Sequence, residues 1–219
     1  MIKEIKRAYK LVQYGLSIKM QLAFACAFAL IGIAVEIATR GSQFLGGFYV
    51  ALSGLFIFQL IVSVDVSTLV QSSSYKRKIQ LVYPYVAVAP LTYIVFTILA
   101  VIHWQVAKNG GDDYIMQCRM IFTLGLILCV TVAYFGICYK YFVAGMIGMF
   151  ILVYAVMIAM ARENSFICRF ASRSYSVSLI SSYILITLGL AIAIILSQIT
   201  YKKDFSKLAF ERMLKRNAK

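Results

Sequence analysis

Charged side chains are scarce in this chain. Asp, Glu, Lys and Arg make up 14% of its 219 residues, whereas hydrophobic residues make up 62% and the mean hydropathy is +0.86. A soluble domain has roughly 25% charged and 45–50% apolar residues, and its surface needs more polar side chains than this sequence offers. The composition excludes a water-soluble globular protein and predicts a single membrane domain over residues 1–219.

Recognisable catalytic motifs are also missing. The sequence has no HExxH, GxSxG or GxGxxG pattern, and no pair of carboxylates within an apolar segment. It has no GxxxxGK(S/T) loop, so we do not expect this chain to bind ATP itself. The five cysteines show no CxxC spacing, which favours small packing residues over a disulfide or a zinc site. We therefore expect neither an enzyme nor a cofactor or metal site.

Negatively charged residues are rarer than positively charged ones: the chain has 8 Asp and Glu against 22 Lys and Arg, for a net charge of +14. In a soluble protein this positive excess would suggest binding to nucleic acid. Beside apolar segments it is the usual signal of topology and of contact with lipid headgroups. We expect membrane lipids as partners, and no nucleic acid.

Six apolar segments are each long enough to cross a bilayer at about 20 residues per helix. They are residues 20–38, 44–64, 85–106, 117–137, 141–161 and 177–199. Before them, apolar residues recur every three or four positions in residues 1–19, and Lys3, Lys6, Arg7 and Lys10 occupy the other faces. This pattern predicts an amphipathic interfacial helix. The predicted fold is an all-α polytopic membrane protein, with six spans in residues 20–199 and a basic tail in residues 200–219.

Basic residues also predict the orientation. Most Lys and Arg residues lie on one side if both termini are cytoplasmic, which favours a multi-pass protein of a bacterial cell (inner) membrane. Arg162, Arg169 and Arg173 then lie outside, between the fifth and sixth spans. We expect that segment to fold against the outer interface as a partly re-entrant helical element.

Ionisable residues are almost absent from the predicted spans. Glu36, Asp65 and Arg119 lie near span ends, where snorkelling to water is the default expectation. His103, the single histidine, precedes Trp104, and we expect it to be solvated within an interfacial aromatic belt. With the loop residues Asp112 and Asp113 it falls short of a catalytic or metal site.

The longest internal polar segment follows the second span and is basic. It contains Ser72, Ser73, Ser74, Tyr75, Lys76, Arg77, Lys78 and Gln80. Pro84 follows it and fits the first turn of the third span. We expect a short helix lying across the membrane surface with its basic cluster toward water or a partner; the alternative is a plain positive-inside loop.

Small residues stand four apart in several spans, which permits close approach of helices. The pairs are Ala23 and Ala27, Ala25 and Ala29, Gly47 and Ala51, Ala144 and Gly148, and Gly189 and Ala193. We expect them to serve packing within the chain rather than a dimer face.

This layout resembles the six-span permease subunits of type-2 exporters in the ATP-binding-cassette (ABC) superfamily. Ser-Ser-Tyr-Lys-Arg-Lys at residues 73–78 and Tyr-Lys-Tyr-Phe at residues 139–142 look like segments of small bacterial permeases of this kind. The resemblance implies that residues 1–19 form a connecting helix and that the stretch from Ser72 to Pro84 holds a coupling helix, which contacts the ATPase. It also implies that Arg162 to Arg173 are re-entrant.

The resemblance further implies two partners: a separate P-loop ATPase subunit and a second permease chain, identical or paralogous, in a dimer. The exported cargo would be amphipathic or hydrophobic, such as a peptide or a lipid-like molecule. A stand-alone membrane interaction or immunity protein without transport activity is the alternative, since it would need the same spans and no chemistry. A membrane-embedded enzyme is disfavoured by the scarcity of ionisable groups.

Overall fold

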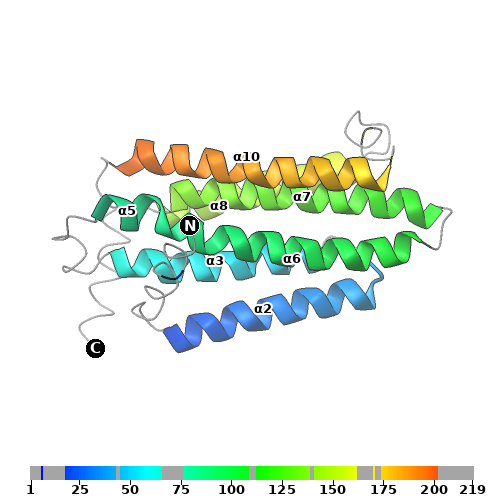
Figure 1. Cartoon of the computed structure of the whole chain (residues 1–219), viewed down its shortest axis with the longest axis horizontal. Coiled ribbons are helices and arrows are strands. Elements are labelled where there is room, and N and C mark those ends of the chain that lie inside the picture. Colours follow the sequence, from blue (N-terminus) through cyan, green and yellow to red (C-terminus); the bar gives the residue numbers. More distant parts are fainter. Residues whose placement is uncertain are drawn as a thin grey trace.

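The computed structural model describes residues 6, 18–42, 45–65, 76–108, 112–138, 141–161, 170 and 174–201. In this part of the chain the regular structure is entirely helical, without strands. The helices are α2 (Ile18–Ala38), α3 (Leu45–Asp65), α5 (Lys76–Leu81), α6 (Tyr83–Ala107), α7 (Asp112–Cys138), α8 (Phe142–Ala161) and α10 (Tyr175–Tyr201). Figure 1 shows the long helices running side by side along the length of the molecule, with α5 as a short piece at one end.

Five helices within the described residues are long and apolar enough to cross a membrane. They are Lys19–Ala38, Tyr83–Ala107, Tyr114–Cys138, Val143–Met160 and Tyr175–Tyr201. Helix α3 has 21 predominantly apolar residues and packs along α2. The prediction of an all-helical, multi-pass membrane protein is therefore confirmed.

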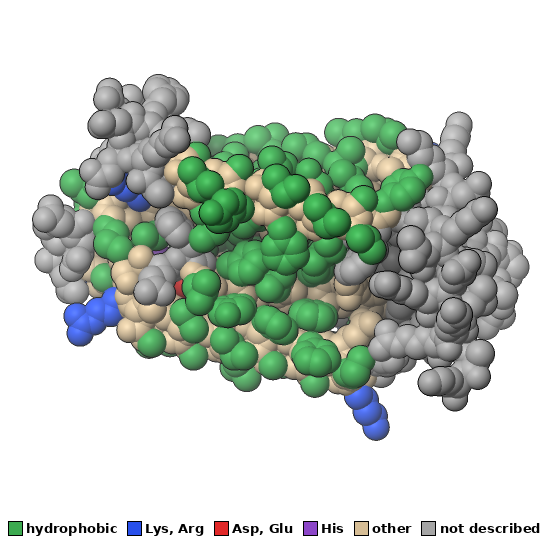
Figure 2. Space-filling model, turned by 180° about the vertical axis from the view of Figure 1, so that it is seen from behind, with side chains coloured by type: hydrophobic (Ala, Val, Ile, Leu, Met, Phe, Trp, Pro, Cys, Tyr) green, Lys and Arg blue, Asp and Glu red, His purple; other side chains and the backbone are tan. Residues whose placement is uncertain are grey.

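The outer surface of the bundle is apolar, as a lipid-facing surface must be. Leu30, Ile151 and Ile180 are 68%, 61% and 60% exposed, and Figure 2 shows hydrophobic side chains over most of the visible face, with basic side chains confined to its ends. Helix α7 is the central element. In its most apolar 18-residue stretch 67% is buried, whereas the corresponding share is 39% or less in the other four spans. It packs against α10, α8, α6 and α3.

Local sequence explains where two of these helices begin and end. Pro84 lies in the first turn of α6, as predicted, where its missing N–H leaves no helical hydrogen bond unmade. Helix α2 ends in a tight turn in which Arg40 and Gly41 have φ angles of 51° and 65°. Both lie in the left-handed region, which glycine adopts readily and arginine only at a cost.

Close approach of α7 and α10 depends on small residues. A Cβ atom added to Gly189 would lie 2.6 Å from the Cys129 carbonyl oxygen, and one added to Gly136 would lie 2.5 Å from the Ala193 carbonyl oxygen. On α3, a Cβ atom added to Gly47 would lie 1.7 Å from Cδ2 of Leu124 on α7. The prediction of internal packing is confirmed for the pairs at Gly47 and at Gly189. It is wrong for Ala23 and Ala27, which are exposed on the outer side of α2.

Candidate functional site

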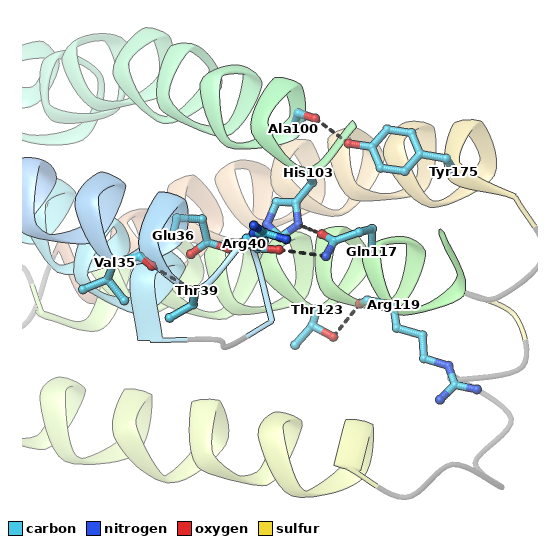
Figure 3. Close-up of polar contacts among 10 residues, drawn as sticks. All are labelled: Val35, Glu36, Thr39, Arg40, Ala100, His103, Gln117, Arg119, Thr123 and Tyr175. Carbon is cyan, nitrogen blue, oxygen red and sulfur yellow. Dashed lines mark hydrogen bonds and ion pairs between the residues drawn. The ribbon is translucent and has the colours of Figure 1, made fainter. Parts of the chain in front are cut away.

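A buried polar network joins α2, α6 and α7 at the end of the bundle that contains the Arg40–Gly41 turn (Figure 3). Glu36 and His103 are both 0% exposed, and His103 Nε2 lies 2.8 Å from Glu36 Oε1. Gln117 on α7 is 2% exposed, and its Nε2 donates a hydrogen bond of 3.0 Å to the Arg40 carbonyl oxygen. Its Oε1 is hydrogen-bonded to His103 Nδ1. Three helices and a turn therefore meet at one imidazole ring.

The hydrogen bonds orient the side chains of Gln117 and His103. Because Gln117 Nε2 donates to the turn, its Oε1 faces His103 Nδ1 and can only accept, so Nδ1 carries a hydrogen. The other ring nitrogen, Nε2, faces Glu36 Oε1 at 2.8 Å. The histidine therefore lies between the Glu36 carboxyl group on α2 and the Gln117 amide on α7, and a buried ionisable group is tolerated only when it is paired in this way.

The Glu36–His103 pair fits into its site because two neighbouring residues are glycines without side chains. A Cβ atom added to Gly41 would lie 2.7 Å from His103 Nδ1, and one added to Gly46 at the start of α3 would lie 2.0 Å from Glu36 Oε2. Glu36 Oε2 is buried and has no hydrogen-bond partner among the described residues. The carboxyl group is therefore enclosed by backbone on one side and by His103 on the other.

This geometry corrects two expectations from the sequence. Glu36 does not snorkel to water and His103 is not solvated, because the ends of α2 and α6 converge beneath the turn and cover both side chains. The expectation for Trp104 agrees with the structure, since Trp104 is 42% exposed and Lys108 Nζ lies 5.9 Å from its ring centroid. One signal for the pair was present in the sequence: an ionisable residue within a membrane span usually faces inward and has a partner.

A second polar arrangement links α6 to α10 in the middle of both helices. Tyr93 Oη and Thr187 Oγ1 are 2.8 Å apart, as are Tyr183 Oη and Thr97 Oγ1. Each threonine also donates to the carbonyl oxygen of the tyrosine four residues earlier on its own helix. Because each threonine hydrogen is used in this way, each tyrosine donates across to the threonine of the other helix. We call these four residues the Tyr-Thr clasp.

The Tyr-Thr clasp explains how hydroxyl groups can face lipid. Thr97 and Thr187 are exposed on the bundle surface, yet all four hydroxyl hydrogens are donated within the clasp. The sequence carries a signal that was missed, because Tyr-Ile-Val-Phe-Thr at 93–97 and Tyr-Ile-Leu-Ile-Thr at 183–187 are the same pattern. On antiparallel helices, two such patterns can pair reciprocally.

Helix α10 is attached to α6 at both ends as well. Tyr175 Oη donates to the Ala100 carbonyl oxygen at 2.5 Å, and Tyr85 Oη donates to the Ala193 carbonyl oxygen at 3.3 Å. Tyr85 is also hydrogen-bonded to Ser197. Within α10, Ser182 Oγ donates to the Ser178 carbonyl oxygen at 2.7 Å.

The predicted basic segment after the second span includes the short helix α5. Arg77 and Lys78 are exposed, whereas Gln80 and Leu81 are 3% and 4% exposed. Helix α5 contacts α3, α6 and α10. One side of α5 is therefore packed on three long helices while basic side chains remain outside. Ser72, Ser73, Ser74 and Tyr75 lie outside the described residues, and Lys76 is the first residue of α5.

Other predicted site residues are placed only in part. Lys6 is exposed, whereas Lys3, Arg7, Lys10, Arg162, Arg169 and Arg173 lie outside the described residues. Asp65 is the last residue of α3, and the Arg119 carbonyl oxygen accepts a hydrogen bond of 2.8 Å from Thr123.

Over the described ranges, His, Cys, Asp and Glu side chains form no group of three that would suit a metal ion. No protein family, curated protein or solved structure matches this chain. In the part of the chain that the structure describes, the fold is that of an all-helical, multi-pass membrane protein.

Proposed function

We propose that this chain is the membrane-spanning permease subunit of an ATP-driven exporter. In this proposal the chain has six spans, α3 being one of them, and both termini are cytoplasmic in a bacterial cell membrane. Two permease chains, identical or paralogous, pack with two copies of a separate P-loop ATPase subunit. The cargo is amphipathic or hydrophobic, such as a peptide or a lipid-like molecule.

The arrangement of α5 is the observation that carries this proposal. A coupling element needs a surface that a soluble partner can push and a firm connection to the spans. Arg77 and Lys78 are exposed, which suits an acidic surface on a partner. Leu81 and Gln80 are buried, and α5 contacts α3, α6 and α10, so a displacement of α5 reaches three long helices at once.

Rigid coupling between the spans also supports this function. Two backbone hydrogen bonds at Val82 join helix α5 to α6: the Val82 N–H donates to the Lys78 carbonyl oxygen at 3.0 Å, and the Val86 N–H to the Val82 carbonyl oxygen at 3.0 Å. Helix α6 is in turn hydrogen-bonded to α10 at three levels along its length. Packed elements of this kind transmit a push at one end as a rigid-body movement.

The test is a purification of the tagged chain from its native host in mild detergent. A P-loop ATPase recovered at fixed stoichiometry is the expected result. Replacing Lys76, Arg77 and Lys78 together with Glu should abolish that recovery or uncouple ATP hydrolysis from transport, while membrane insertion is unchanged. Lys108→Glu, a charge reversal at an exposed lysine at the other end of α6, is the matched control and should leave recovery intact.

Two results would overturn the proposal. Reproducible absence of an ATPase from intact, correctly inserted protein would favour the stand-alone interaction or immunity protein. Normal ATPase recovery and normal transport by the triple Glu variant would remove α5 from the coupling role.

A further inference from the structure

A partly open cavity of about 180 Å³ lies between α2, α3, α6 and α7. Its inner wall is buried and apolar, and includes Val50, Ala51, Val88, Leu128 and Val132. On its α2 side it is bordered by Leu22 and Cys26, which are exposed. The cavity is therefore closed toward the core of the bundle and open toward the membrane.

The path of α2 accounts for this opening. Near its C-terminal end α2 is joined to α6 through Glu36 and His103. Figure 1 shows α2 slanting away from α6 toward its N-terminal end. Gly54 on α3 borders the cavity, and a Cβ atom added there would meet no atom within 4 Å.

The lining of the cavity is largely apolar, and its hydroxyl groups belong to Ser53, Thr92 and Thr131. Ser53 Oγ donates to the Val50 carbonyl oxygen at 2.7 Å and Thr92 Oγ1 to the Val88 carbonyl oxygen at 3.0 Å. Their hydrogens are therefore used within their own helices. A void of roughly 150 Å³ lined by apolar side chains stays free of water and accepts an apolar molecule. An open void of this kind inside a bilayer borders directly on acyl chains.

Lys19 places a positive charge near one end of the cavity. It is exposed in the first turn of α2 and lies seven residues before Cys26, which is two helical turns, so both lie on the same side of the helix. The N-terminal end of a helix also favours negative charge. An acyl chain in the cavity would leave its headgroup near this lysine, at the end of the bundle that also contains α5.

We infer that the cavity binds one acyl chain of an anionic membrane phospholipid, with Lys19 beside the headgroup. Its volume fits a segment of a single chain rather than a whole lipid. This assignment concerns a lipid-binding site in one chain and does not depend on the proposed transport function.

The test uses the full-length protein in nanodiscs of phosphatidylcholine that contain a trace of phosphatidylglycerol with a diazirine in its acyl chain. After illumination, adducts are mapped by mass spectrometry. We expect adducts on the cavity-lining residues of α2, α3 and α6, and we expect them to decrease when unlabelled phosphatidylglycerol replaces a small part of the phosphatidylcholine. Gly54→Leu, which extends into the open space, should abolish them. Ala27→Leu on the opposite, exposed side of α2 is the matched control and should retain them.

A second pair of variants tests the charge. Lys19→Gln should reduce the preference for phosphatidylglycerol by about fivefold, the effect of removing one basic residue near the membrane surface, whereas Lys108→Gln should not. Unchanged adducts in folded Gly54→Leu would overturn the acyl-chain site, and an unchanged preference in Lys19→Gln would overturn the role of Lys19. If Gly54→Leu does not fold, Ala29→Leu fills the cavity from α2 and decides the question by the same readout.

Discussion

Glu36 on α2 and His103 on α6 form an ion-pair contact of 2.8 Å in which neither side chain is exposed to solvent. The pair lies where α2 comes closest to α6, and the second ring nitrogen of His103 connects it through Gln117 to the turn after α2. Removing either member leaves a buried polar group without its partner, a change that costs much more than losing a surface ion pair.

Single alanine substitutions of the pair should therefore be strongly destabilising. We expect Glu36→Ala and His103→Ala each to lower the free energy of unfolding by about 3 kcal/mol, because each leaves an unpaired buried group and a small void. The measurement is reversible denaturation in mixed micelles of mild detergent and dodecyl sulfate. Thr39→Ala is the control, since it removes a half-buried hydroxyl near the network whose hydrogen bond is local to α2.

The double variant Glu36→Leu/His103→Leu separates a pairing cost from a packing cost. Replacing both partners by apolar groups leaves no unpaired charge, so the double variant should be more stable than either alanine variant. A double variant that loses the sum of the two single effects would contradict the pairing, because it would mean that the two side chains act independently.

Much of the helical architecture was predictable because it depends on local properties of the chain. Long apolar runs indicate spans, and Pro84 marks the first turn of α6. The Glu36–His103 pair was not predictable in the same way, because its burial depends on how α2 and α6 converge, and that follows from contacts between residues far apart in the sequence. Gly41 and Gly46 were equally uninformative alone, since their role is to leave room for side chains on other helices.

Gly41→Ala should destabilise the protein for two reasons. Its φ angle of 65° is unfavourable for a residue with a Cβ atom, and that atom would lie 2.7 Å from the His103 ring. We expect a loss of about 2 kcal/mol or more in the free energy of unfolding. Gly54→Ala is the matched control: it adds the same methyl group to a helix in open space, and should be neutral or stabilising by up to about 1 kcal/mol. Equal effects of the two substitutions would show that neither the φ angle of Gly41 nor the contact with His103 contributes to stability.

The Tyr-Thr clasp predicts a modest and specific effect of removing single hydroxyl groups. Tyr93→Phe and Tyr183→Phe each remove one donor and leave the aromatic packing in place, since the two rings are stacked with centroids 6.2 Å apart. Each should cost about 0.6 kcal/mol, the average for hydrogen bonds between membrane helices. Tyr154→Phe, at a tyrosine that is 66% exposed on α8, is the control and should have no effect. A clasp variant that is as stable as that control would show that the clasp hydrogen bonds add nothing to stability.

Labelling of cysteines placed at the two ends of α6 tests the predicted orientation. Lys78 and Lys108 are exposed beyond opposite ends of a helix of 25 residues, which is about 37 Å long and sufficient to cross the hydrocarbon core. In a background without the five native cysteines, Lys108→Cys should react with a membrane-impermeant maleimide in intact cells, and Lys78→Cys only after permeabilisation. The reverse pattern would place α5 and the basic residues outside and would contradict an ATPase contact at α5. Labelling of both in intact cells would mean that α6 does not cross the membrane, because a spanning helix cannot have both ends on the same side.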